Sequence, residues 1–294
     1  MGPTVRVATI NLLKSARRWP ERLPLVAAGL AELQPDLIGL QEVIFRAGGT
    51  TAHDLARELG GYEVVAAPKT GRHRRAEGVA VLSRLPIREH ESLPLVGGEG
   101  RVAQFVRVEA AGERPLRFAN GHYLWRPLAH RTRARQVEQV LAHLGRGDPA
   151  VPLVVGGDFN ATPESPAIAA IRRAMTSAHA ATHGGEPDST CPSPLRSGRR
   201  VPDALFNFLL DTCSNRPEGP WRATLDYLFV GPGVRVLDCQ VCLNQPAPTD
   251  PTLYPSDHFG LIATLEVAPL RGRGETDAAR TRPAPHDAGL ASSS

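Results

Sequence analysis

The sequence predicts an α/β protein in which two mixed sheets pack face to face with helices outside, a four-layer α/β sandwich. Strand-like segments occur in both halves of the chain, and helical segments lie between them. Several strand pairs are joined by short turns such as Gly112-Glu113, which a doubly wound parallel sheet does not use. The 294 residues are 41% hydrophobic, enough to bury a full core.

The first part of the chain alternates between strand and helix patterns. Residues 5–12 alternate as a half-buried strand does, and residues 20–33 repeat apolar side chains at helical spacing until Pro35 stops the pattern. Residues 36–43 then form a buried strand ending in Gln41-Glu42, and residues 51–59 form a second helix.

Shorter strands fill the middle of the chain. We expect them at 62–66, 78–83, 101–109 and 116–120. Residues 130–144 form an amphipathic helix, because Val137, Val140, Leu141 and Leu144 share one face. The apolar strand 151–155 then delivers the segment 156–160, Gly-Gly-Asp-Phe-Asn, at its carboxyl end.

Three strands, at 225–230, 234–243 and 259–267, close the fold. Before them, residues 176–223 are rich in Pro, Gly, Ser and Arg and have little periodicity, which predicts a functional loop or a partly mobile segment. We expect one domain over residues 1–268. The polar, repetitive residues 269–294 predict a disordered tail.

Net charge and the lengths of the apolar runs restrict the classes of protein to which this sequence can belong. The net charge is +4, and of the 34 basic residues only Lys14 and Lys69 are lysines. Arginine suits phosphate binding, although an Arg-rich composition also arises from a biased genome. No apolar run approaches the roughly 20 residues needed to cross a bilayer, and the start shows no signal peptide. We expect a cytoplasmic monomer without a membrane span.

Four cysteines, Cys191, Cys213, Cys239 and Cys242, do not form a disulfide framework in a chain of this length. Together they offer a hypothetical Zn²⁺ site. Cys239 and Cys242 lie three apart on a predicted strand, however, and so face opposite sides. We therefore favour buried structural cysteines.

Polar side chains that suit phosphate-ester hydrolysis follow the strand-like runs. These candidates are Asn11, Glu42, His122, Asp158 with Asn160, Asp226, and Asp257 with His258. Mg²⁺ prefers oxygen ligands and needs only one or two carboxylates, and hydrolysis also needs an activated water. Each candidate alone has a structural alternative, such as a surface carboxylate, a core histidine or an Asx-turn. Their order along the chain favours a shared site.

In that order the motifs resemble the endonuclease/exonuclease/phosphatase superfamily, which includes deoxyribonuclease I, AP endonucleases, deadenylases and neutral sphingomyelinases. The resemblance extends from about Val5 to Val267. Its motifs are residues 9–12 (TINL), 40–43 (LQEV), 78–84 (GVAVLSR), 120–122 (NGH), 157–160 (GDFN), 225–227 (LDY) and 256–258 (SDH).

The resemblance implies a metal site. Glu42 would bind Mg²⁺, for which Mn²⁺ can substitute, and Asn11 would support the metal or the phosphate. Asp257 would lie on the metal side.

The resemblance also implies catalytic roles. Asp158 would orient or deprotonate the attacking water, and Asn160 would hold a phosphoryl oxygen. His258 would stabilise developing charge, with its ring fixed by Asp226. His122 would serve the phosphate or the leaving group.

Two departures from the pattern concern the branch of the family. AP endonucleases carry an Asp two residues after the first Asn, where this chain has Leu13, and a Tyr where His122 stands. Abasic-site cleavage is therefore disfavoured. His122 resembles the deoxyribonuclease, deadenylase and sphingomyelinase branches instead.

Residues near the expected cleft bear on the substrate. Trp125 and Arg126 follow His122 closely, which predicts an aromatic ring and a guanidinium at the mouth of the cleft as substrate-binding residues. Base stacking is the functional interpretation, and core packing of Trp125 is an alternative. The basic run 72–75 either follows a phosphate backbone or is a solvated loop. The stretch 190–195 resembles a loop of deadenylase-like members.

The function expected is Mg²⁺-dependent hydrolysis of phosphate esters by a phosphodiesterase or nuclease acting on nucleic acid or nucleotides. The alternative enzyme is a phosphatase or lipid phosphodiesterase acting on a small phosphorylated substrate. A third hypothesis is a non-catalytic binding module of the same fold. Such a module is expected to have lost a metal-binding or base residue, and this sequence keeps all of these candidates.

Overall fold

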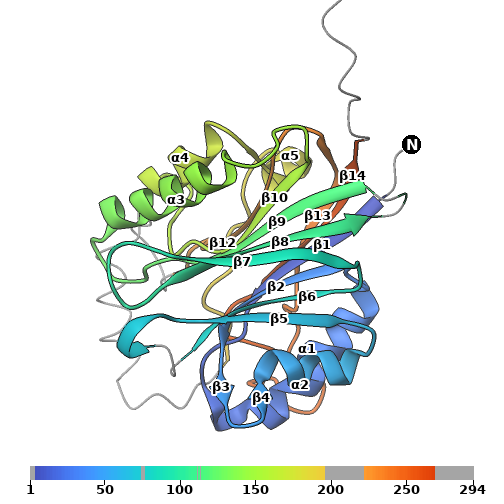
Figure 1. Ribbon diagram of the computed structural model, residues 1–294. Helices are drawn as coiled ribbons and strands as arrows, with labels where there is room; N and C mark the ends of the chain where they lie inside the picture. Colours follow the sequence, from blue (N-terminus) through green and yellow to red (C-terminus); the bar gives the residue numbers. More distant parts are fainter. Residues whose placement is uncertain (1–3, 74–76, 111, 113, 196–221, 269–294) are drawn as a thin grey trace, which may run out of the picture.

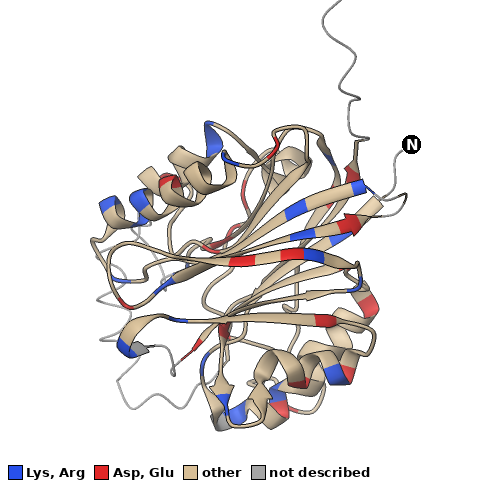
Figure 2. Cartoon of the chain, in the orientation of Figure 1, with Lys and Arg blue, Asp and Glu red and all other residues tan. Residues whose placement is uncertain are grey.

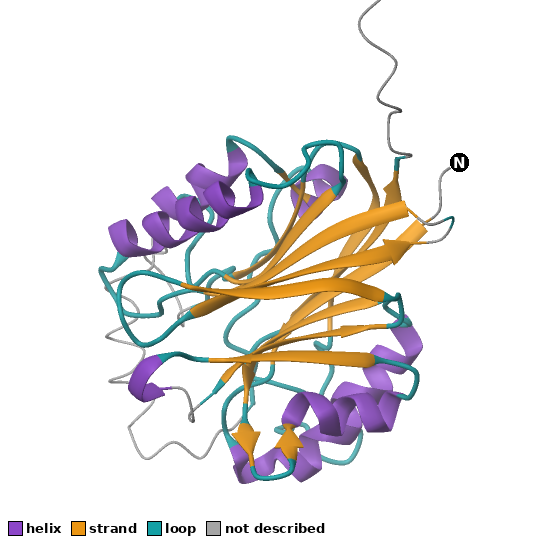
Figure 3. Ribbon diagram, in the orientation of Figure 1, coloured by secondary structure: helices purple, strands orange, loops and turns teal. Residues whose placement is uncertain are grey.

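The computed structural model describes residues 4–73, 77–110, 112, 114–195 and 222–268. Two six-stranded sheets pack face to face, and helices cover both outer faces (Figure 1). The layers stand out when strands and helices are coloured separately (Figure 3). The predicted four-layer α/β sandwich is confirmed. The predicted tail, 269–294, lies outside the described residues.

The first sheet combines strands from both ends of the chain, in the order β13-β14-β1-β2-β6-β5. Its strands are β1 (Thr4–Asn11), β2 (Leu37–Val43), β5 (Glu63–Pro68), β6 (Gly78–Ser83), β13 (Val234–Cys242) and β14 (Gly260–Val267). β1 and β2 are parallel, whereas the other pairs are antiparallel.

The second sheet has the order β11-β12-β10-β9-β8-β7. Its strands are β7 (Ile87–Pro94), β8 (Val102–Ala110), β9 (Arg114–His122), β10 (Leu153–Asp158), β11 (Thr176–Ser177) and β12 (Asp226–Val230). β9 and β10 are parallel, so their carboxyl ends meet at one edge of the sheet.

Five α-helices and four short elements complete the described fold. The helices are α1 (Trp19–Leu33), α2 (Thr51–Leu59), α3 (His130–Leu144), α4 (Pro166–Arg172) and α5 (Ala178–His183). The short elements are the 3-10 turns η1 (Ala16–Arg18) and η2 (Gly71–His73) and the small hairpin of β3 (Phe45–Arg46) and β4 (Gly49–Thr50).

Three apolar layers lie between the four layers of secondary structure. One fills the space between the sheets and includes Leu37, Phe118 and Leu265. A second packs α1 and α2 on the first sheet, and a third packs α3 and α4 on the second sheet. The apolar periods predicted for residues 20–33 and 130–144 therefore mark the buried faces of α1 and α3.

The elements that periodicity missed are short or exposed. Strand β7 forms the edge of the second sheet, and six of its eight residues are exposed. Charged residues occur along it (Figure 2), and such residues protect an edge strand from pairing with other chains. Helices α4 and α5 have only seven and six residues, and each begins after a serine whose hydroxyl caps it, Ser165 and Ser177.

The cysteines of the described chain are buried and free. Cys239 lies in the layer between the sheets, and Cys242 lies in the layer beneath α1. They face opposite sides of β13, as predicted, and cannot share a metal ion. Cys213 lies outside the described residues. Among the helices described, none combines the length and the apolar character needed to cross a membrane.

A buried amide pair joins the two sheets beneath the carboxyl ends of their strands. Gln41 of β2 donates its Nε2 to Oδ1 of Asn120 of β9 over 2.7 Å. Asn120 donates back to the carbonyl oxygens of Leu40 and Ala80, at 3.0 and 2.9 Å. Gly39 leaves the room for this contact, because a Cβ there would lie 2.9 Å from Oδ1 of Asn120.

Replacement of Asn120 by Ala should destabilise the fold by about 2–4 kcal/mol, because it removes the donor that Asn120 gives to two buried carbonyls and the acceptor that it gives to the Gln41 amide. Urea denaturation followed by circular dichroism measures this change. Gln240→Ala on the exposed face of β13 is the matched control and should change stability by less than about 0.5 kcal/mol. Equal effects of the two substitutions would contradict a bridging role for Asn120.

Candidate functional site

The register of the second sheet places three candidate residues in a row. Asp158, at the end of β10, pairs with His122 of parallel β9 on one side and with Asp226 of antiparallel β12 on the other. Gly121 and Gly157 precede His122 and Asp158, and a Cβ on Gly157 would lie 2.0 Å from the carbonyl oxygen of Gly121. The glycines therefore permit the close approach of the strands just before the site.

The first sheet contributes Glu42 through an irregularity of β2. The pairing of β2 with β6 shifts register between Leu40 and Val43, and Glu42 has a φ of +55°. Such a bulge redirects a side chain at the end of a strand. The backbone N–H of Lys14, in the loop after β1, donates to Oε2 of Glu42 over 2.6 Å.

One cluster of possible metal ligands joins Glu42, Glu77 and His122, whose ligand atoms lie within 4.8 Å of one another. Burial raises the pKa of Glu42, and the charges of Glu77 and Asp257 raise it further. Like charges held this close in a buried place favour a bound cation. Oε2 of Glu77 is buried and has no hydrogen-bond partner among the described residues.

Burial lowers the pKa of His122 well below its ordinary value, and the charges of Arg101 and Lys69 lower it further. The imidazole is therefore neutral near pH 7. A neutral ring can accept a proton or bind a metal ion through a nitrogen lone pair.

The second cluster joins Asp158, Asp226 and His258, again with ligand atoms within 4.8 Å. Nδ1 of His258 lies 2.8 Å from Oδ2 of Asp226, and the hydroxyl of Thr190 donates to the same oxygen over 2.6 Å. The carboxylate thus fixes the imidazole ring, and Thr190 fixes the carboxylate.

The charge state of His258 follows from its neighbours. Burial alone lowers the pKa of His258, but Cys191 and the Asp226 carboxylate outweigh burial and hold it well above its ordinary value. Burial also raises the pKa of the Cys191 thiol to about 11, so this thiol is neutral near pH 7. The Asp226 carboxylate, hydrogen-bonded to the ring, is therefore the negative charge beside His258 that raises its pKa.

Asp158 is the most constrained carboxyl of the site. Burial raises the pKa of Asp158 to about 7, against the opposing charge of His258 and with help from Asp226. Its oxygens accept from Nδ2 of Asn11 at 2.9 Å and from the N–H of Asn160 at 2.8 Å. Such a carboxyl can take up a proton from water near neutral pH.

His122 joins the two clusters, since its Nε2 lies 3.5 Å from Oδ2 of Asp158. Asn160 has a φ of +47° and donates Nδ2 to the carbonyl oxygen of Tyr123 over 3.2 Å. The ring of Phe159, which lies between Asp158 and Asn160 in the sequence, stacks on the ring of Tyr123 with the centroids 4.6 Å apart. Aromatic packing on the outer face of the sheet thus positions the turn that carries Asp158 and Asn160.

Two predicted metal residues lie beside the carboxylate clusters. The amide of Asn11 is bonded at both ends, to Asp158 and to the N–H of Leu13, so it supports Asp158. Asp257 is close enough to raise the pKa of Glu42. The carboxylates of Glu42 and Glu77 offer the oxygen ligands that suit Mg²⁺, with Asp257 beside them.

The loop after β9 exposes the predicted substrate residues. Trp125 is 47% exposed, so the alternative of core packing is wrong. Nε of Arg126 donates to Oε1 of Glu99 over 2.7 Å. Of the basic run 72–75, residues 74 and 75 lie outside the described residues.

Sequence reasoning missed Glu77, Thr190 and Lys69. Glu77 directly precedes β6, and an acidic residue immediately before a predicted strand was the available signal. Lys69 makes a buried ion pair with Glu77. This ion pair is not visible in the sequence, because it forms only when β5 and β6 pair and bring the two ends of their connecting loop together.

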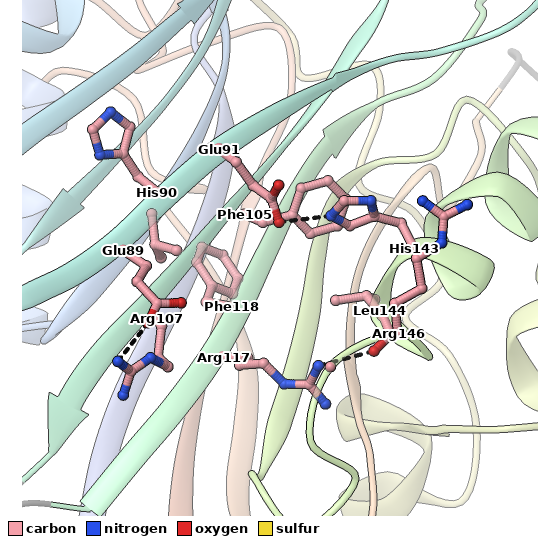
Figure 4. A pocket seen from close by; sticks show the side chains of 12 residues that line it. Glu89, His90, Glu91, Phe105, Arg107, Arg117, Phe118, His143, Leu144 and Arg146 are labelled. Carbon is pink, nitrogen blue, oxygen red and sulfur yellow. Dashed lines mark hydrogen bonds and ion pairs between the residues drawn. The ribbon is translucent and has the colours of Figure 1, made fainter.

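A separate cavity of about 410 Å³ lies on the outer face of the second sheet beside the end of α3 (Figure 4). Its two carboxylates are paired: Glu89 lies 2.6 Å from Arg107, and Glu91 lies 2.7 Å from His143. Arg117 donates to the last turn of α3. The cavity contains none of the predicted site residues, so we assign the chemistry to the strand ends.

Comparison with known proteins identifies the family that this sequence resembles. The sequence model of the endonuclease/exonuclease/phosphatase family matches residues 8–258. Among curated proteins, protein angel of Drosophila melanogaster is 26% identical over 191 residues, which are 60% of this chain. The match spans about half (51%) of the relative's length.

Solved structures share the fold. The human Nocturnin catalytic domain with a bound sulfate anion has a TM-score of 0.67 at 23% identity, over 90% of this chain and 94% of its own. A family protein from Bacteroides vulgatus has a TM-score of 0.67 at 20% identity, over 90% and 99%. TDP2 of D. rerio complexed with a single strand DNA product has a TM-score of 0.66 at 16% identity, over 89% and 98%.

Asp158→Asn should change how the stability of the metal-free protein depends on pH. Because the folded-state pKa of Asp158 is raised to about 7, ionisation of this carboxyl destabilises the wild type increasingly as pH rises from about 4 to 7. The variant lacks this ionisation. In EDTA, the Tm of the variant relative to that of the wild type should therefore rise by on the order of 5 °C between pH 5 and pH 8.

Thermal unfolding at four pH values measures this difference. Asp238→Asn, at an exposed position of β13, is the control and should follow the wild-type curve at every pH. A difference in Tm between Asp158→Asn and wild type that does not change with pH would show that burial does not raise the pKa of Asp158.

Proposed function

Because the chain belongs to the endonuclease/exonuclease/phosphatase family, we propose that it is a Mg²⁺-dependent phosphodiesterase or nuclease acting on nucleic acid or nucleotides. Members of this family are divalent-metal-dependent phosphoesterases, and this chain is one of them. The identity of the metal and the class of substrate are the proposed parts.

The observation that carries the proposal is the meeting of two carboxylate and imidazole clusters in one buried site. Glu42, Glu77 and His122 form one, and Asp158, Asp226 and His258 form the other. Hydrolysis of a phosphodiester needs neutralised charge, an activated water and a proton for the leaving oxygen, and the two clusters together offer all three.

Each group has a proposed task. Glu42 and Glu77 would hold Mg²⁺, which when bound neutralises phosphate charge and polarises the P–O bond. Asp158 would take the proton of the attacking water, and protonated His258 would donate a hydrogen bond to a phosphoryl oxygen. Neutral His122 would serve the leaving group or the phosphate.

Two observations favour a nucleic acid or nucleotide substrate. Trp125 is exposed close to His122 and offers a face on which a base can stack. A structure of TDP2 that shares this fold contains a single strand DNA product. The net charge of +4 is compatible with a polyanionic substrate.

Diester and monoester activity should separate in a chromogenic assay. With Mg²⁺ present we expect turnover of bis-p-nitrophenyl phosphate in preference to p-nitrophenyl phosphate, and loss of turnover in EDTA with recovery on adding Mg²⁺ or Mn²⁺. Preference for the monoester would favour a phosphatase. Lack of turnover of both compounds, of DNA and of RNA would favour a binding module.

Asp158→Ala and His258→Ala should each lower kcat by about a thousandfold, because each removes a group that takes part in proton transfer or charge stabilisation. Glu42→Ala should raise the Mg²⁺ concentration needed for half-maximal activity. Glu63→Ala, on the exposed edge of β5, is the matched control. Wild-type rates in the first two variants, or an unchanged Mg²⁺ titration in the third, would contradict these roles.

A further inference from the structure

Two buried cations border the site on its His122 side. Arg101 directly precedes β8 and is 2% exposed, and Lys69 directly follows β5 and is 7% exposed. Their segments are hydrogen-bonded to each other, since the N–H of Thr70 donates to the carbonyl oxygen of Gly100 over 2.9 Å. Arg101 and Lys69 therefore lie side by side despite coming from different sheets.

The carboxylates near Arg101 and Lys69 accept hydrogen bonds from only some of the N–H donors of these two side chains. Lys69 pairs with Glu77, which also belongs to the metal-ligand cluster. Arg101 reaches Glu99 only at 3.4 Å, and Glu99 accepts a shorter bond from Arg126. Nε and Nη1 of Arg101 are buried and have no acceptor within the described part of the chain.

Other largely buried arginines differ from Arg101 in this respect. Arg22, Arg117 and Arg133 also leave Nε without an acceptor, yet each bonds both of its terminal nitrogens to nearby groups. A buried guanidinium with unused donors beside a second cation costs stability. Binding sites commonly keep such a cost in stability, because the ligand supplies the missing acceptors when it binds.

The position of the pair indicates what this ligand is. Contacts run from Asp226 and His258 through Asp158 to His122, and from Glu77 to Lys69. Arg101 and Lys69 thus lie beyond the metal-ligand cluster, away from His258. Glu99 connects Arg101 with Arg126, next to exposed Trp125.

We propose that Arg101 and Lys69 form a subsite for a second phosphate group of the substrate, next to the scissile ester on the His122 side. This inference rests on the proposed function and narrows it to substrates with two or more phosphates. The planar guanidinium keeps two unused donors, Nε and Nη1, for phosphate oxygens, and the Lys69 ammonium adds a point charge. The second phosphate belongs either to the next unit of a nucleic-acid chain or to a terminal phosphate of a nucleotide.

Short deoxythymidine substrates test the subsite. We expect the wild type, with Mg²⁺, to cleave dithymidylate that carries a terminal phosphate at least about tenfold more efficiently, in kcat/KM, than dithymidylate without one. In Arg101→Gln this ratio should fall to near one. Arg101→Lys keeps the positive charge but removes the guanidinium donors Nε and Nη1, and should give an intermediate ratio.

Arg107→Gln is the matched control, because Arg107 lies on β8, the strand that directly follows Arg101, and pairs with the exposed Glu89. It should keep the wild-type ratio. If the wild type cleaves both dinucleotides equally well, the subsite is refuted while the proposed function stands. If the wild type cleaves neither dinucleotide nor longer oligothymidylate, both fail.

Longer oligothymidylate without a terminal phosphate distinguishes the two sources. A gain in kcat/KM with chain length that Arg101→Gln abolishes assigns the subsite to the phosphate of the neighbouring nucleotide. A gain only with the terminal phosphate assigns it to a nucleotide end.

Thermal unfolding separates binding from a structural role. Because Arg101→Gln removes unused buried donors, the Tm should stay unchanged or rise. A Tm lowered by more than about 5 °C, together with an unchanged preference for the added phosphate, would make Arg101 a structural residue and overturn the inference.

Discussion

Two buried amide contacts between the sheets determine where the site can form. Asn11 at the end of β1 donates to Asp158 at the end of β10, and Gln41 of β2 donates to Asn120 of β9. Apolar packing between sheets is non-directional and tolerates sliding, whereas a buried hydrogen bond has a direction and costs about 1–3 kcal/mol when unmet. The amides therefore fix one alignment of the sheets, and only in that alignment do side chains from both sheets share a site.

The same region holds local conformations and charges that the rest of the fold must stabilise. Leu13, Glu42 and Asn160 have φ values of +56°, +55° and +47°, a region that non-glycine residues rarely adopt. Burial and like charges raise the pKa values of Glu42 and Asp158. Since a bound cation would relieve the repulsion among these carboxylates, the site is best understood as one that requires a positive charge beyond those of its own side chains.

Periodicity and motifs predicted most of the fold and the line of candidate residues, because buried strands and helices keep apolar side chains on one face. Strand β7 escaped detection because its exposed edge position requires no apolar alternation. Glu77 escaped because its role depends on Glu42 of the neighbouring strand β2 and on His122, which approaches only when the second sheet packs on the first. Exposure of Trp125 could not be predicted either, since an aromatic residue after a strand suits the core and the surface equally.

Two buried arginines border the site, and their bonds distinguish positioning from binding. The terminal nitrogens of Arg22 donate to four carbonyl oxygens, those of Leu12, Leu13, Ser15 and Pro255. These bonds tie the loop after β1 to the segment before Asp257 and His258, so backbone oxygens fill its donors and a ligand has little left to bind. Arg101 is equally buried, but two of its nitrogens find no acceptor in the described chain. The same side chain thus positions loops where the backbone satisfies it and binds a phosphate where the backbone does not.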